Sequence, residues 1–158
     1  MAGKRIQADC LELDDEGKGI VKVPGEDVSL RYVLPGETLL LEVEKGYYGP
    51  EVRLVEVLKS SPDRVKALCP VYRLCGGCQL QHMNYKAQLS FKEELVRSLL
   101  GRFAPVQAIL GMENPWDYRN KALASLALGQ EGKTVSGIFG EKSHQVVPVD
   151  HCLIQDPS

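Results

Sequence analysis

Three cysteines stand close together in the middle of the chain, in the stretch CPVYRLCGGC that begins at Cys69. Their C-x5-C-x2-C spacing lets Cys69, Cys75 and Cys78 close a short loop around one centre. Gly76 and Gly77 favour such a loop, because glycine permits backbone angles, including positive φ, that other residues avoid. Thiolates are soft ligands that suit iron-sulfur clusters and zinc. The stretch therefore predicts a metal site.

A fourth thiolate is needed from elsewhere in the chain, and the remaining cysteines are Cys10 and Cys152. Cys10 lies in the alternating stretch ADCLEL, which is typical of a strand, where a free cysteine acts as a small buried hydrophobe. Cys152 follows a β-like run and is preceded by the polar His151. We therefore expect Cys152 to be the fourth ligand and Cys10 to lie in a core.

Buried cysteines without a metal, disulfides and zinc are the alternatives to an iron-sulfur site. Disulfides persist in oxidising compartments, whereas the opening MAGKRIQADC lacks the apolar run of a signal peptide and so predicts a cytoplasmic protein. Structural zinc sites usually pair two short C-x2-4-C knuckles, and here one ligand is far away. The spacing favours iron-sulfur and leaves zinc open.

Composition limits the choice of partners. The chain has 158 residues, of which 44% are hydrophobic, as expected for one or two small soluble domains. No apolar run approaches the ~20 residues that cross a bilayer, so no membrane partner is expected. The net charge of −2 excludes a uniformly basic nucleic-acid-binding protein. The first 60 residues are net acidic and the rest net basic, so any RNA contact has to come from local patches.

The first 60 residues predict a small β domain. Alternating apolar residues and turn signals indicate five strands, at 4–13, 20–23, 28–34, 38–43 and 52–58. Five short strands without a helical period favour a closed barrel of the OB type. Such barrels often bind oligonucleotides, although a purely structural barrel remains an alternative. The stretch SSPD at 60–63 resembles a linker, which predicts domains at 1–60 and 61–158.

The sequence of the second domain predicts one helix and a β-meander. The expected fold class of the whole chain is therefore mainly β (α+β). Asn84 can cap a helix that runs to about Leu100. Its apolar positions recur at three- and four-residue steps and predict a buried stripe of Leu89, Leu95, Val96, Leu99 and Phe103. Three strands are expected at 118–128, 134–140 and 144–149, with a turn at GQEG.

Arg119, Asn120 and Lys121 form a compact polar group at the start of the first of these expected strands. Their side chains can contact phosphates and base edges, so the group is a candidate RNA contact. A solvated strand end is the alternative explanation of the same residues.

Several stretches together resemble the iron-sulfur RNA uracil-5-methyltransferases. LPGE at 34–37, SPDRV at 61–65, CGGCQLQH at 75–82, YRNKA at 118–122 and the stretch 144–152 follow in the order seen in that family. The similarity covers essentially the whole chain. It implies an N-terminal TRAM domain with the OB-like barrel, then an iron-sulfur central domain whose four-iron, four-sulfur cluster is bound by Cys69, Cys75, Cys78 and Cys152.

In that family a later domain binds S-adenosylmethionine, and a cysteine there attacks C6 of a flipped uridine so that C5 accepts the methyl group. These 158 residues contain no glycine-rich turn between a strand and a helix and no cysteine after Cys152. The resemblance therefore implies the RNA-recognition and iron-sulfur portion of an RNA (uracil-C5)-methyltransferase, with an incomplete second domain and no catalytic residues of its own. It favours rRNA over tRNA as the RNA partner. A free-standing RNA-binding or redox-sensing iron-sulfur module is the alternative.

Overall fold

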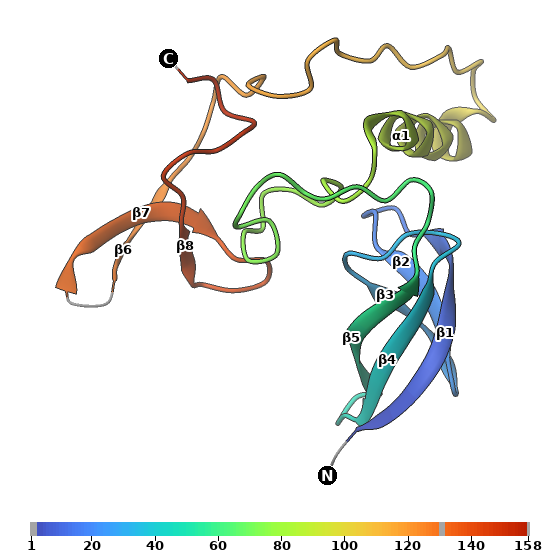
Figure 1. The fold of residues 1–158 in the computed structure, drawn as a ribbon. Coiled ribbons are helices and arrows are strands. Elements are labelled where there is room, and N and C mark those ends of the chain that lie inside the picture. The colour runs from blue at the N-terminus through green and yellow to red at the C-terminus, as the bar shows by residue number, and fades with distance from the viewer. Residues whose placement is uncertain (1–2, 130–131, 158) are drawn as a thin grey trace. The chain divides into compact units, whose positions relative to one another are not determined.

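The computed structural model describes residues 3–129 and 132–157, which fall into two compact units (Figure 1). Unit 1 comprises residues 3–65 together with His82–Asn84, and unit 2 comprises Lys66–Gln81 and residues 85–157. The described residues are mainly β, with one α-helix. The strands of unit 1 are β1 (Lys4–Leu13), β2 (Gly19–Val23), β3 (Glu26–Leu30), β4 (Thr38–Lys45) and β5 (Pro50–Lys59).

Unit 1 is a five-stranded antiparallel sheet in the order β3-β2-β1-β4-β5 (Figure 1). Among the residues described, β3 and β5 are the two edges of the sheet, so its pairing does not close into the expected barrel. The expected strand at 28–34 is too long, because β3 ends at Leu30 and Tyr32 has a φ of 65°. A bulky residue with positive φ interrupts an extended chain. The segment after β3 therefore turns inward and places Val33 and Leu34 in the interior.

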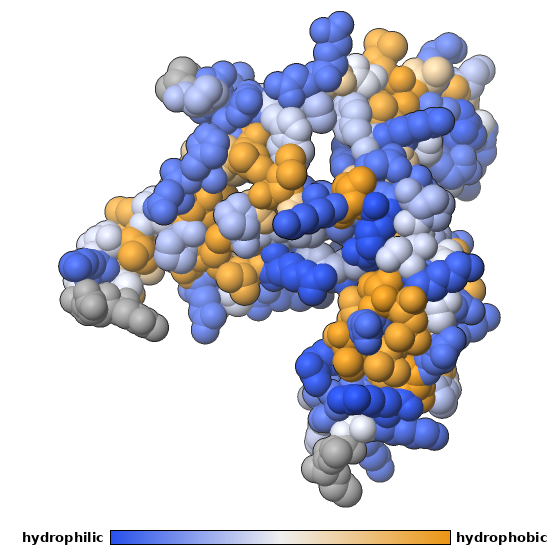
Figure 2. Space-filling view, in the orientation of Figure 1, coloured by the Kyte–Doolittle hydropathy of each residue, from blue (hydrophilic) through white to orange (hydrophobic). Residues whose placement is uncertain are grey.

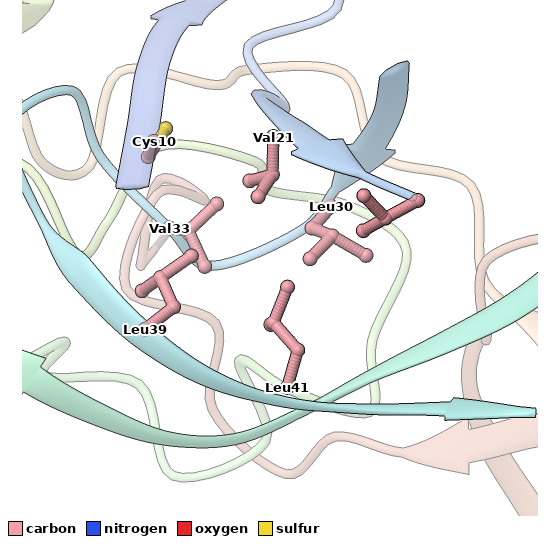
Figure 3. Packing of buried hydrophobic residues seen from close by; sticks show 7 residues of the cluster. Cys10, Val21, Leu30, Val33, Leu39 and Leu41 are labelled. Atoms are coloured by element: carbon pink, nitrogen blue, oxygen red, sulfur yellow. The ribbon is translucent and has the colours of Figure 1, made fainter. Parts of the chain in front are cut away.

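The core of unit 1 is formed by apolar side chains from β1 to β4 and from the turn after β3 (Figure 3). Its buried members are Cys10, Val21, Val23, Leu30, Val33, Leu39 and Leu41. The prediction that Cys10 is a core residue is confirmed, since the residue is 2% exposed. Burial, together with the nearby Glu37, raises the pKa of the Cys10 thiol to about 12. The thiol therefore stays protonated at neutral pH.

Unit 2 contains the helix α1 (Tyr85–Leu100), which begins one residue after Asn84 and ends at the predicted position. Among residues 3–129 and 132–157, no helix is long and apolar enough to cross a membrane. The prediction of a buried stripe is wrong, because no residue of α1 is buried. Val96, Leu99 and Phe103 are exposed, and Figure 2 shows hydrophobic residues at the surface in the region of α1.

The reason is that unit 2 covers only the first half of the helix. Ile109 donates its backbone N–H to Glu93 at 2.9 Å, and Met112 donates its own to the Tyr85 hydroxyl at 2.8 Å. These bonds hold the segment 109–112 against the N-terminal half of α1. Among the described residues, segment 109–112 forms no such hydrogen bond with the last two turns of α1, where Val96 and Leu99 are exposed.

Unit 2 also contains a three-stranded antiparallel sheet in the order β6-β7-β8, formed by β6 (Ser125–Leu128), β7 (Thr134–Phe139) and β8 (Val146–Pro148). The predicted meander is therefore confirmed. Its first strand begins at Ser125 instead of Tyr118, so residues 118–124 form a connection and are not part of the strand. Part of the expected GQEG turn, Gln130 and Glu131, lies outside the described residues.

Candidate metal centre

The cysteine loop is a series of tight turns that bring Cys69 and Cys75 to one side. Tyr72 donates its backbone N–H to the Cys69 carbonyl at 3.2 Å, and Cys75 donates its own to the Val71 carbonyl at 2.8 Å. The Tyr72 side chain is buried, and its hydroxyl donates to the Gln79 carbonyl at 2.5 Å. The loop is thus fixed by its own backbone and by one buried tyrosine.

Gly76 attaches this loop to the meander. Its N–H donates to the carbonyl of Phe139 at 3.0 Å, and the loop lies beside the end of β7 (Figure 1). A Cβ at Gly76 would lie 2.9 Å from the Phe139 oxygen and 3.0 Å from the backbone nitrogen of Glu141. The glycine is therefore required by close backbone approach. The expected positive φ is not found at Gly76 or Gly77.

Cys152 is held by a second set of backbone hydrogen bonds. Gln155 donates its N–H to the Cys152 carbonyl at 3.1 Å, which closes a turn. Arg119 forms a parallel bridge with Gln155, and its N–H donates to the Ile154 carbonyl at 2.8 Å. Asp117 donates to the Leu153 carbonyl at 3.1 Å. The segment 117–119 therefore fixes the turn that carries Cys152.

One pocket of unit 2 is lined by all four predicted ligands, Cys69, Cys75, Cys78 and Cys152. All the cysteines are free thiols, and Cys10 lies apart from this pocket, in the core of unit 1. Among the described residues of unit 2, the buried apolar side chains are Tyr72, Cys75 and Ile154, and each of them lines the same pocket. The interior of unit 2 is thus concentrated at its cysteines.

The electrostatics of Cys78 reflect this crowding. Burial raises the pKa of its thiol, a hydrogen bond from Gln81 opposes the rise, and the neighbouring thiols Cys152, Cys75 and Cys69 add to it. Like groups disfavour a shared negative charge, which is why these neighbours raise the pKa of Cys78 further. Cys75 also accepts a hydrogen bond from the Gly77 backbone N–H, with a nitrogen-to-sulfur distance of 3.3 Å.

The described part of the chain nevertheless contains no three histidine, cysteine, aspartate or glutamate side chains that converge as ligands of a single metal ion. The four thiols share the wall of a pocket without meeting at one point. This arrangement differs from a structural zinc site, in which four ligands lie within about 2.3 Å of one ion.

The three predicted RNA contacts differ in their exposure to solvent. Arg119 is half-buried and lines the cysteine pocket, whereas Asn120 and Lys121 are exposed. None of the three lies in a strand, so the expectation that they open the first strand of the meander is wrong. Arg119 pairs instead with Gln155, outside the named strands.

Gln81 is a site residue to which the sequence assigned no role. It lines the cysteine pocket, and its Oε1 accepts a hydrogen bond from the Cys69 backbone N–H at 3.3 Å. The available signal was its position three residues after Cys78, in the stretch CGGCQLQH. Gln79 in the same stretch offers the same functional group, so the sequence could not tell which glutamine faces the sulfurs.

No protein-family model matches the chain. Similar proteins occur in Halalkalibacterium halodurans (41% identity), Caldanaerobacter subterraneus (36%) and Enterococcus faecalis (46%). All three are named uncharacterized RNA methyltransferases. The matches cover 95%, 98% and 68% of this chain, but 34%, 35% and 25% of these relatives. The chain is thus similar over most of its length to proteins with that name and spans about a third of the first two.

Proposed function

We propose that this chain is the RNA-recognition and iron-sulfur portion of an S-adenosylmethionine-dependent RNA (uracil-C5)-methyltransferase, acting on rRNA in the cytoplasm. The observation that carries the proposal is the pocket lined by Cys69, Cys75, Cys78 and Cys152. The proposal is supported by two relatives that are named RNA methyltransferases. Each of them is about three times as long as this chain. Methyl-donor binding and methyl transfer are assigned to another part of such a longer protein.

The thiols of this chain support that division of labour. Methylation at uracil C5 requires a nucleophile that saturates the ring, and the thiolate, not the thiol, is the reactive form of cysteine. Four of the five thiols line one pocket, where the proposal uses them as ligands. The fifth, Cys10, is buried with a pKa of about 12 and is therefore neither accessible nor ionised.

The spread of the thiols around the pocket favours a four-iron, four-sulfur cluster over zinc. Four thiolates are the usual ligands of such clusters, and they also bind structural zinc, so the donor set alone does not separate the two. Each cysteine of a cluster binds a different iron, so the sulfurs surround a volume, in keeping with thiols that line a pocket without converging. When bound, the cluster would supply a redox-active centre that also cross-links loop 69–78 to the turn at Cys152.

Metal analysis tests this assignment. Protein purified without oxygen is expected to contain about four iron atoms and four acid-labile sulfides per chain, with broad visible absorption. Iron, sulfide and zinc are measured on the same sample. Stoichiometric zinc with no visible absorption would rule out the cluster and leave the zinc alternative.

RNA binding is expected to depend on salt and on the exposed residue Lys121. Phosphate contacts release counterions, so affinity falls as salt rises, and losing one contact lowers the salt slope by about 1. Lys121→Ala should therefore weaken binding to a structured rRNA fragment and flatten the dependence of Kd on salt between about 50 and 200 mM. Fluorescence anisotropy measures both quantities.

Lys92→Ala is the matched control, because Lys92 is an exposed cation of the same unit on α1. It should bind like the parent. Arg119→Ala is compared in the same series, and it should weaken binding if the half-buried side chain still reaches a phosphate. If Lys121→Ala and Arg119→Ala both bind as the parent does at low salt, the group is a solvated segment and makes no RNA contact.

A further inference from the structure

Gln81 joins two parts of the cysteine loop that are distant in sequence. Its Oε1 accepts the backbone N–H of Cys69 at 3.3 Å, on the entry side of the loop. With Oε1 engaged in this way, the Nε2 group remains as a donor in the same pocket wall as Cys78, at the exit of the loop. A carboxamide is suited to this task, since it carries one acceptor and two donors. The half-buried side chain therefore spans the loop within the wall of the pocket.

We propose that Gln81 is a positioning residue of the cysteine site, which closes the loop between Cys69 and Cys78 and donates a hydrogen bond to the Cys78 sulfur of the loaded protein. The proposal rests on the iron-sulfur function proposed above. It adds a residue outside the ligand set and predicts what that residue does to the bound cluster.

Hydrogen bonds to ligand sulfurs are among the factors that set the reduction potential of a cluster. A donor withdraws negative charge from the sulfur and stabilises the reduced state, which carries one more electron. Loss of the donor should therefore lower the potential. The same reasoning applies to the Gly77 N–H at the Cys75 sulfur, which a side-chain substitution leaves in place. Gln81 is thus the donor that mutagenesis can remove while leaving every sulfur ligand unchanged.

Gln79 provides a matched control two residues earlier. Its Nε2 donates to the Gly76 carbonyl at 3.2 Å, and it is exposed. It does not line the cysteine pocket. Gln79→Leu and Gln81→Leu make the same chemical change in the same loop, but only the second removes a donor to sulfur. A role confined to bracing the loop would not distinguish the two variants in reduction potential.

The experiment compares the anaerobically purified parent with Gln79→Leu, Gln81→Leu and Gln81→Glu. Iron and sulfide content are measured first, and a mediated redox titration followed by electron paramagnetic resonance then gives each potential. At the potential where the parent is half reduced, the ratio of reduced to oxidised cluster should fall about tenfold in Gln81→Leu, which corresponds to ~59 mV for a one-electron couple. Gln79→Leu should stay within about twofold of the parent.

Gln81→Glu covers the case in which Gln81→Leu fails to hold a cluster. A carboxylate still accepts the Cys69 N–H but cannot donate to sulfur, and its charge opposes reduction, so its potential should also be lower than that of the parent. Potentials in the two Gln81 variants equal to that of Gln79→Leu would overturn the role of Gln81. Absence of iron from the parent would instead overturn the iron-sulfur proposal itself, so the two failures are distinguishable.

Discussion

Substitution of Cys69, Cys75, Cys78 or Cys152 by serine is expected to remove most of the iron and to loosen unit 2, whereas Cys10→Ala should retain the iron. The four positions line one pocket, and Cys10 lies in a separate core. Alanine is chosen at position 10 because a buried serine hydroxyl would need a hydrogen-bond partner. Cys10→Ala should lower the stability of unit 1 alone.

The loss of order follows from where unit 2 buries its side chains. Its buried apolar residues, among those described, are Tyr72, Cys75 and Ile154, and all three line the cysteine pocket. Unit 1 contains a separate seven-residue core. When ligands are brought together only in the folded chain, binding of the metal contributes directly to folding. Removal of the metal should therefore affect unit 2 far more than unit 1.

Amide hydrogen exchange measures this difference along the chain. In the serine variants, protection should fall at least about tenfold in β6, β7 and loop 69–78, while β1 and β4 exchange as in the parent; a tenfold change is about 1.4 kcal/mol of opening free energy. Retention of full iron in any serine variant would remove that residue from the ligand set. Equal loss of protection in both units would show that the fold as a whole depends on the metal.

Local patterns predicted most of the strands and the extent of α1. Alternation in β1 indicates one buried and one solvent face, and Cys10 follows that alternation into the core. The helix begins after Asn84 and ends at Leu100, as capping and periodicity indicated. In each case the pattern lies within one helix or strand, where the sequence spacing of two residues determines whether they lie on the same face.

Features that depend on tertiary contacts could not be predicted. The apolar positions of α1 indicated a buried stripe, but a hydrophobic period does not reveal whether another segment covers it, and Val96 and Leu99 remain exposed. The positive φ of Tyr32, which ends β3 early, has no signal in the residue type. Gln79 and Gln81 carry the same side chain, but only Gln81 lines the cysteine pocket. Spacing therefore pointed to the three cysteines of the loop, and elimination of Cys10 pointed to Cys152, but neither indicated that Gln81 lies beside them.

Two of the stretches that carried the family resemblance meet in unit 1. Glu37 of LPGE is fully buried and accepts hydrogen bonds from Arg64 of SPDRV through both of its oxygens. The backbone N–H groups of Leu34 and Ser61 donate to the same carboxylate at 2.9 and 3.2 Å. Arg64 also donates to the Tyr32 carbonyl at 2.7 Å. The pair thus fixes the turn after β3 to the segment that follows β5.

Glu37→Gln is expected to destabilise unit 1 by about 3 kcal/mol, because removing one partner of a buried pair leaves the other charge uncompensated. Glu42→Gln is the matched control. Glu42 pairs with Arg53, whose side chain is 74% exposed, and such surface pairs contribute about 0–1 kcal/mol. Urea unfolding of the full chain, followed through amide signals of β1 and β4, gives both values. Similar losses in the two variants would mean that burial does not strengthen the Glu37 pair.

The effect of Glu37→Gln should also depend on pH in a defined direction. Burial alone would raise the pKa of Glu37, but the hydrogen bonds from Arg64, Leu34 and Ser61 outweigh it, so the pKa lies below its ordinary value of 4.5. A carboxyl with a lowered pKa in the folded state contributes stability that is complete above the unfolded-state pKa and is lost as pH falls through the folded-state pKa. The difference in unfolding free energy between the parent and Glu37→Gln should therefore be constant near neutral pH and shrink in acid, below 4.5. A difference that stays unchanged from neutral pH into that acidic range would show that the charge of Glu37 does not stabilise unit 1.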